Sequence, residues 1–165
     1  FACELSPIRP SHPGYSKINI RLTTKPPLSV PAQFLNADLD VFSDRDLQPL
    51  IDEIGERAFL LHGGPYTDEL PFMARYEIDH DPETKSPETL IVAFCLIIES
   101  LSSTSRALWD SSRQRVIDLG YEVLMSRDRT HDRITADTLA RMATLHIDLA
   151  WSFYPSDETQ HLPQE

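Results

Sequence analysis

The sequence predicts a single α+β domain, with a mainly antiparallel sheet of four to six strands and helices packed on one face of that sheet. The chain has 165 residues, of which 41% are hydrophobic and 25% are charged, enough to bury one core. Segments 72–79 and 115–125 alternate apolar and polar residues, as strands with one buried face do. Residues 90–98 form an unbroken apolar run, which indicates a helix buried against such a sheet.

The N-terminal part predicts an arm followed by the start of the domain. Residues 1–16 contain three prolines and a glycine, so we expect an extended arm there and the domain itself over 17–155. Segment 17–23 alternates, with three aliphatic residues on one face, and predicts a half-buried strand. Segment 33–41, which follows a proline-rich break, predicts a further short strand.

The next segment predicts a short helix. Its apolar residues between positions 47 and 54 recur at helical spacing, Ser43 suits an N-cap, and Gly55 suits a stop. Because Pro49 does not fit a helix interior, we expect the helix to start near Leu47.

Two strands and a long helix are predicted to follow. The strands cover 57–62 and 72–78. Ser86, Pro87 and Glu88 combine a cap, a proline at the first helical position and a carboxylate in the first turn. The helix should run to about residue 100.

The remaining elements alternate between helices and strands. Serines 102–105 predict a break and the cap of a helix over 106–111, and 115–125 predicts a strand in which Gly120 indicates a bulge. Thr135 predicts the cap of another helix, which leads into a strand over 146–153 with one apolar face. Residues 156–165 are predicted to be a polar tail.

Negative charge is concentrated in one third of the chain. Fourteen carboxylates and four basic residues lie between Asn36 and Glu88, which gives this segment −10 of the net charge of −11. Such a field favours partners of opposite charge and speeds their association.

The same composition argues against two classes of partner. Phosphate binding needs clustered basic residues, but the chain has only three lysines, and acids are interleaved through its arginine-rich stretch 106–133. We therefore expect neither nucleic-acid binding nor attachment to an anionic membrane surface. No apolar run approaches the length of a membrane span.

Two cysteines, Cys3 and Cys95, give no disulfide framework. Cys95 lies in the apolar run, where we expect a buried and inert thiol, and a reducing, cytoplasmic setting is the expected one. Because the first residue is Phe1, we also expect that upstream residues were trimmed or removed.

No motif for a metal, a cofactor or catalysis is complete. The pattern Asp38-x-Asp40-x-x-x-Asp44-x-Asp46 invites a calcium site, but an EF-hand needs glycine and glutamate at places that Ser43 and Pro49 occupy. An irregular carboxylate site and a role at strand ends and helix caps both stay open. The six histidines have no zinc-ligand spacing, and no nucleophile motif or glycine-rich phosphate loop occurs. We expect no metal, no cofactor and no catalytic residue.

One stretch carries a resemblance. Leu108-Trp109-Asp110, the segment from Arg115 to Tyr121, the segment 138–143 and Phe153-Tyr154-Pro155 together resemble an uncharacterised bacterial family of small α+β domains of unknown function. The resemblance covers about 108–155 and implies the fold class.

These observations favour a binding module, in its most concrete form a bacterial immunity or antagonist protein that neutralises a basic protein partner. The predicted partner-binding residues are acidic and come from the negative segment: Asp38, Asp40, Asp44, Asp46, Asp52, Glu53, Glu56, Asp68 and Glu69. One alternative is a small hydrolase or transferase that uses carboxylates and a histidine, with Asp110, Asp118 and Glu122 as candidates near Trp109 and Tyr121. Another is a structural domain that forms a homodimer through the apolar terminal strand.

Overall fold

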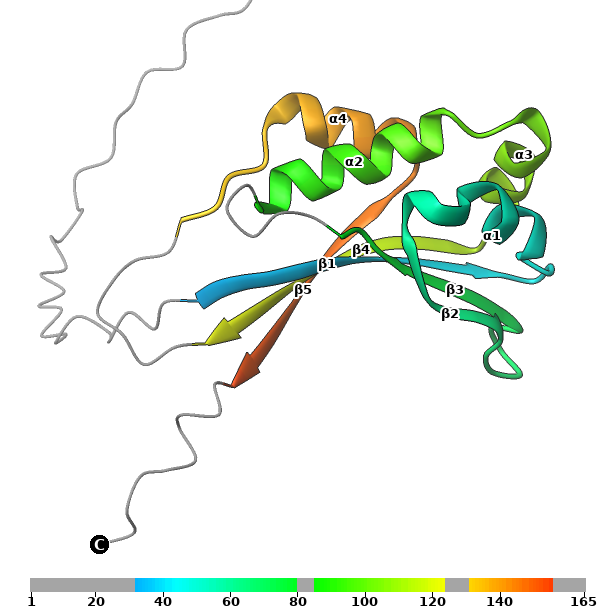
Figure 1. Cartoon of the computed structure of the whole chain (residues 1–165), viewed down its shortest axis with the longest axis horizontal. Helices are drawn as coiled ribbons and strands as arrows, with labels where there is room; N and C mark the ends of the chain where they lie inside the picture. The colour runs from blue at the N-terminus through cyan, green and yellow to red at the C-terminus, as the bar shows by residue number, and fades with distance from the viewer. Residues whose placement is uncertain (1–31, 80–84, 124–130, 156–165) are drawn as a thin grey trace, which may run out of the picture.

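The chain folds into a five-stranded sheet, in the order β2-β3-β1-β4-β5, with four helices on one of its faces (Figure 1). This computed structural model describes residues 32–79, 85–123 and 131–155. The predicted fold class is confirmed: a single α+β domain with a mostly antiparallel sheet. The predicted arm, the predicted strand 17–23 and the predicted tail lie outside the described residues.

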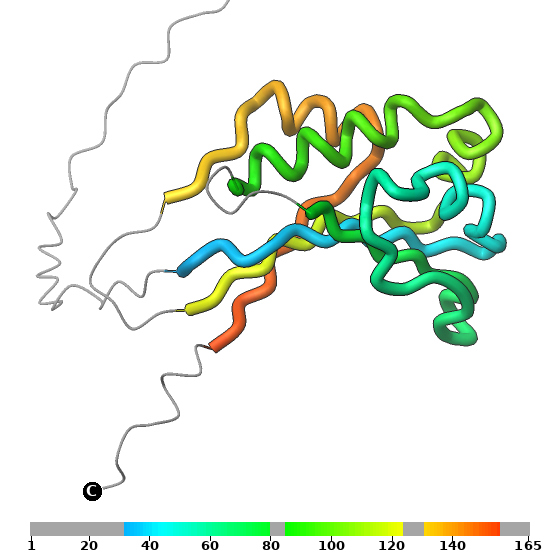
Figure 2. Tube along the Cα trace, viewed as in Figure 1, coloured from blue at the N-terminus to red at the C-terminus, as the bar shows by residue number. Residues whose placement is uncertain are grey.

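Strand β1 (Ala32–Ser43) is the central strand. It pairs antiparallel with β3 (Phe72–Glu77) on one side and with β4 (Gln114–Val123) on the other. Strand β2 (Phe59–Pro65) forms a hairpin with β3, and β5 (Asp148–Pro155) pairs parallel with β4 (Figure 2). Among the described strands, β2 and β5 therefore form the two edges of the sheet.

Helix α1 (Gln48–Ile54) starts where its proline requires. Leu47 precedes the first helical residue, Pro49 lies in the first two positions, and Gly55 ends the helix with a φ of 52°. The prediction of Ser43 as its N-cap is wrong, because β1 continues through Ser43, whose hydroxyl accepts a hydrogen bond from the Arg45 N–H at 3.0 Å. A short 3-10 turn, η1 (Gly55–Arg57), leads into β2.

Helix α2 (Pro87–Glu99) has the predicted start. The Ser86 hydroxyl accepts from the Thr89 N–H, and the Thr89 hydroxyl accepts from the Ser86 N–H, which completes a capping box. Helix α3 (Ser103–Ser111) begins earlier than predicted, because Ser102 provides its cap.

Helix α4 (Ala136–Thr144) is capped by Thr135, as predicted, and Glu88 connects it to α2. The Glu88 carboxylate accepts hydrogen bonds from the N–H and the hydroxyl of Thr135 and from the hydroxyl of Thr138, at 2.6–3.1 Å. The starts of two helices that are distant in sequence are thereby joined.

The predicted bulge lies opposite Gly120 and not on its own strand. Phe34 pairs with Tyr121 and Asn36 pairs with Gly120, so Leu35 is the additional residue, and it belongs to β1.

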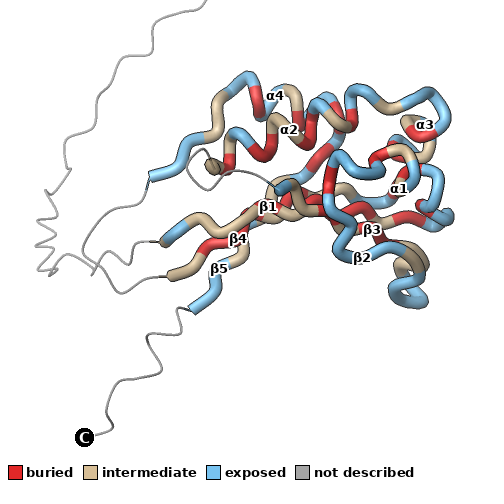
Figure 3. The backbone as a smooth tube through the Cα atoms, viewed as in Figure 1, coloured by how far each residue is buried: buried red, intermediate tan, exposed pale blue. Residues whose placement is uncertain are grey.

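The core lies between the helices and the sheet (Figure 3). Ala37, Leu39 and Val41 of β1 are at most 1% exposed, and Trp109 donates its indole N–H to the Leu145 carbonyl at 3.1 Å. Cys95 is fully buried, as predicted, and burial raises the pKa of its thiol to about 11. Within the described ranges, no single helix is long and apolar enough to cross a membrane, and α2 and α3 meet that criterion only as a pair bent by 119°.

Candidate functional site

The face of the sheet opposite the helices carries a row of acidic side chains. Because side chains alternate along a strand, Asp38 points away from the core that Leu39 enters. Asp38 pairs with Glu77 of β3 on one side and with Asp118 of β4 on the other. Directly paired residues lie on the same face of a sheet. Glu77, Asp38 and Asp118 therefore cross the three central strands side by side, and we call them the carboxylate row.

The arginine whose charge acts on Asp38 already forms an ion pair with another acid. Arg75, on β3, donates two hydrogen bonds of 2.6 Å to the two carboxylate oxygens of Asp40, which is 7% exposed. This bidentate pair neutralises Asp40. Among the described residues, no member of the carboxylate row forms an ion pair.

The central carboxylate of the row is in an unfavourable environment. Burial raises the pKa of Asp38 to about 6, and the charges of Glu77, Asp40 and Asp118 act in the same direction against the opposing effect of Arg75. A cationic group placed against Asp38 would relieve this repulsion and favour the ionised form.

Asp118 has one satisfied oxygen and one unsatisfied oxygen. Its Oδ2 accepts a hydrogen bond of 2.7 Å from the Ser152 hydroxyl, whereas Oδ1 is buried and has no hydrogen-bond partner in the described structure. A buried acceptor without a donor costs free energy.

The amide of Asn36 completes this part of the face. It lies over Gly120, where a side chain would collide with its Oδ1 atom, and its Nδ2 atom donates to Asp38 at 3.1 Å. Asn36 therefore fixes the orientation of Asp38 without supplying charge.

An exposed ring lies at the end of the row. Phe59 pairs with Glu77 across the β2–β3 hairpin and is 61% exposed. It lines a depression of about 330 Å³ together with Glu77, Ile78, Asp79 and Lys85. An aromatic face beside carboxylates is a combination that receives ammonium and guanidinium groups.

The structure separates the predicted partner-binding acids into three groups. Only Asp38 and Asp40 lie on the face of the sheet opposite the helices, which we call the open face. Asp44 pairs with Arg113 at 2.6 Å, and the same guanidinium donates to the Glu69 carbonyl, so both residues lie around Arg113 at another end of the sheet, with Asp68 in the adjacent β2–β3 turn.

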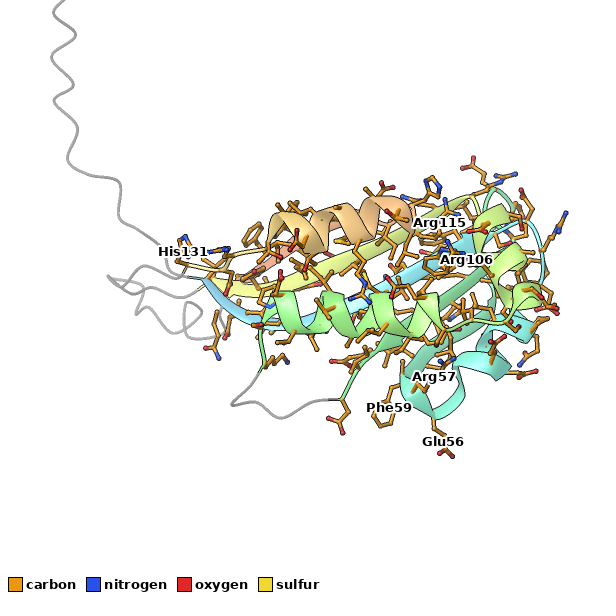
Figure 4. All side chains as sticks on the ribbon, turned by 90° about the horizontal axis from the view of Figure 1, so that it is seen from above. Glu56, Arg57, Phe59, Arg106, Arg115 and His131 are labelled. Atoms are coloured by element: carbon orange, nitrogen blue, oxygen red, sulfur yellow. The ribbon has the colours of Figure 1, made fainter. Side chains whose placement is uncertain are left out.

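The other predicted acids belong to the helical layer, where two of them form hydrogen bonds at helix starts. Asp46 accepts from the Gln48 N–H at the start of α1, and Glu53 accepts from the N–H and hydroxyl of Ser102 at the start of α3. Asp52 accepts from the Gln48 side chain. Glu56, in η1, points outward at the same edge as Phe59 (Figure 4).

The candidates for a carboxylate cleft near Trp109 are also divided. Asp110 lies on α3 and pairs with Arg106 at 2.9 Å, whereas Asp118 and Glu122 lie on β4. Arg115, which lies close to them in the sequence, donates to the carbonyls of Trp109, Asp110, Ser112 and His146. In the described ranges, no three His, Cys, Asp or Glu side chains are arranged to hold a metal ion.

Sequence reasoning missed three residues of this face, Glu77, Asn36 and Ser152, and considered Asp118 only for a cleft near Trp109 and not beside Asp38. Alternation placed Glu77 and Asp118 on the polar sides of their strands, but it carried no information on the pairing register that brings both to Asp38.

No family model matches the chain, and no curated protein and no solved structure matches it either.

Proposed function

We propose that this protein is a binding module whose open sheet face receives a cationic side chain of a basic protein partner, with the carboxylate row as the binding site. The observation that carries the proposal is the register of β1 with β3 and β4, which aligns three carboxylates that form no ion pair within the described residues.

A guanidinium suits this row better than other cations. It is planar and presents several N–H donors, so it can bridge neighbouring carboxylates, while the exposed ring of Phe59 can stack against it. The most concrete form of the proposal is an immunity or antagonist protein that neutralises a basic partner. In that form the remaining acids raise the association rate, and the carboxylate row holds the anchoring side chain.

The test compares two variants of equal net charge. A short oligo-arginine peptide is titrated by calorimetry into the wild type, into D38N/E77Q/D118N and into D52N/E56Q/D68N. Each variant loses three charges, but only the first loses the row. We expect the first to bind at least about tenfold more weakly, which is about 1.4 kcal/mol, and the second to remain close to the wild type. Equal losses in both would show that the peptide senses only net charge and would overturn the proposal.

A second candidate function is acid–base catalysis, favoured by one observation. Asp38, whose pKa burial raises to about 6, directly faces Asp118 across the strands, and two neighbouring carboxylates are an arrangement that can serve acid–base catalysis. A panel of chromogenic esters, glycosides and phosphates would test it. We would expect a pH–rate profile with an apparent pKa near 6 that D38N abolishes, and an absence of turnover across the panel would contradict it.

A further inference from the structure

We propose that β5 is an interface for a second copy of this chain, which pairs antiparallel with it about a two-fold axis and joins the described five-stranded sheets of the two copies. This inference is independent of the proposed function, because it concerns the edge of the sheet and not the carboxylate row. It rests on three observations: an aromatic ladder that stops at β5, the regularity of this edge, and its lack of charge.

Three rings form a ladder on the helix side of the sheet. Phe34 of β1 contacts Tyr121 of β4 with 5.4 Å between ring centroids, and Tyr121 stacks on Phe153 of β5 at 5.7 Å with an interplanar angle of 28°. The ladder ends there, with Phe153 61% exposed and Trp151, on the same side, 53% exposed. A further strand bearing aromatic residues would continue it.

The β5 edge lacks the features that protect natural sheet edges. Its pairing with β4 runs from Asp148 to Pro155 without a register shift, and the residues between these two are uncharged. Edge strands are usually blunted by bulges, prolines or charges along their length.

The other edge is protected, although it exposes comparable apolar area. Strand β2 has a register shift between Leu60 and His62, and its Gly64 has a φ of 132°. Phe59, on this strand, is 61% exposed, as Phe153 is on β5. Exposure alone therefore does not distinguish the two edges, whereas regularity does.

A second copy is the occupant that this strand fits best. In an antiparallel pair centred on Ser152, Trp151 of each copy lies opposite Phe153 of the other, so the two ladders meet and no like charges oppose each other between the central residues. Trp151, Phe153 and Tyr154 each expose about half of their surface. With side chains of roughly 150–250 Å² each, they supply about 300 Å² per copy before the backbone is counted. The interface then approaches about 1,000 Å², the size of a small specific interface.

The first test measures mass in solution. Sedimentation velocity on the full chain at micromolar concentrations should give twice the 18.8 kDa mass of one chain. Phe153→Lys should shift the protein to monomer, whereas Phe59→Lys, at an equally exposed position on β2, should leave it dimeric. A monomeric wild type at about 100 μM, or dissociation by Phe59→Lys alone, would overturn the proposal.

A second measurement does not depend on the folding of Phe153→Lys. In a Cys3→Ser background, Ser152→Cys places two thiols opposite each other at the proposed two-fold axis, and a short bismaleimide should join them into a covalent dimer. Leu61→Cys, on β2, is the matched control and should remain unlinked. Equal linkage at both positions, or none at position 152, would contradict the proposed pairing.

Discussion

The Oδ1 atom of Asn36 occupies the space that a side chain on Gly120 would need. The two residues pair across β1 and β4, next to the one-residue bulge at Leu35, and the same amide donates to Asp38. Glycine at position 120 is thus required by what lies above it and not by its backbone conformation, since its φ is not positive.

Gly120→Ala should therefore destabilise the protein only when Asn36 is present. The new methyl group would displace the amide and break its hydrogen bond to Asp38, at a cost of about 1–2 kcal/mol in the free energy of unfolding. In an Asn36→Ala background, the same change should be neutral or stabilising by up to about 1 kcal/mol, because alanine restricts the unfolded chain. Urea denaturation of the four proteins of this double-mutant cycle measures the coupling, and additive effects would refute the steric explanation.

Asp38→Asn should stabilise the protein at neutral pH. The folded-state pKa of Asp38, about 6, lies above the ordinary aspartate pKa of 3.8, so folding favours the protonated form. Its ionisation in the fold lowers stability progressively from about pH 4 to about pH 6, and the penalty is complete above that range. The shift corresponds to at most about 3 kcal/mol, and solvent screening of this half-exposed group reduces the expected gain to about 1–2 kcal/mol.

The measurement is denaturant unfolding of wild type and Asp38→Asn at pH 4 and at pH 7.5. The difference in the free energy of unfolding between the two proteins should be small at pH 4 and should reach the expected gain at pH 7.5. Asp148→Asn, at an exposed position at the start of β5, is the control and should show little change at either pH. A gain that does not depend on pH would contradict the assignment.

Arg75→Met should destabilise the fold strongly, because it leaves the carboxylate of Asp40 buried and unpaired. Breaking such a pair from one side costs about 3 kcal/mol, and slightly less here because the Arg75 side chain is 40% exposed. The double variant Asp40→Leu/Arg75→Met should recover most of this loss. Arg106→Met, which breaks the exposed pair with Asp110, is the control and should cost less than about 1 kcal/mol. Thermal unfolding measures the stability of both variants. Similar losses of stability in Arg75→Met and Arg106→Met would refute the explanation that the burial of Asp40 makes its pair the more important one.

Local sequence patterns predicted most of the elements of the fold. Alternation located β3, β4 and β5, and the capping chemistry of Ser86 and Thr135 marked two helix starts. The serine cluster 102–105 predicted a third cap, but the start of α3 was placed too late. Where two local signals competed at Ser43, the tertiary structure decided: pairing of β1 with β3 and β4 extends the strand over a residue that could have capped a helix.

The candidate site was harder to predict from the sequence, because it depends on pairing between strands that are distant in the sequence. The count of acids in sequence grouped Asp38 with Asp46 and Glu53, which form hydrogen bonds at helix starts, and it omitted Asp118, which lies next to Asp38 in the sheet. Acids that are neighbours in sequence can serve caps and ion pairs, whereas acids that share a surface are brought there by register.

Glu88→Gln should loosen the connection between α2 and α4, with a pH dependence opposite to that of Asp38. Burial raises the pKa of Glu88, but hydrogen bonds from Thr138 and Thr135, with the charge of Arg133, outweigh it, and the pKa falls below its usual value. A lowered pKa means that the stabilisation is present above the unfolded-state pKa and is lost as the pH falls through the folded-state value. The variant should therefore cost about 1 kcal/mol at pH 7 and progressively less below about pH 4.5. Glu56→Gln, in the exposed turn η1, serves as the control in urea denaturation at both pH values and should match the wild type. An equal effect of Glu88→Gln at pH 7 and at pH 3.5 would show that the ionised carboxylate is not what holds the two helix starts together.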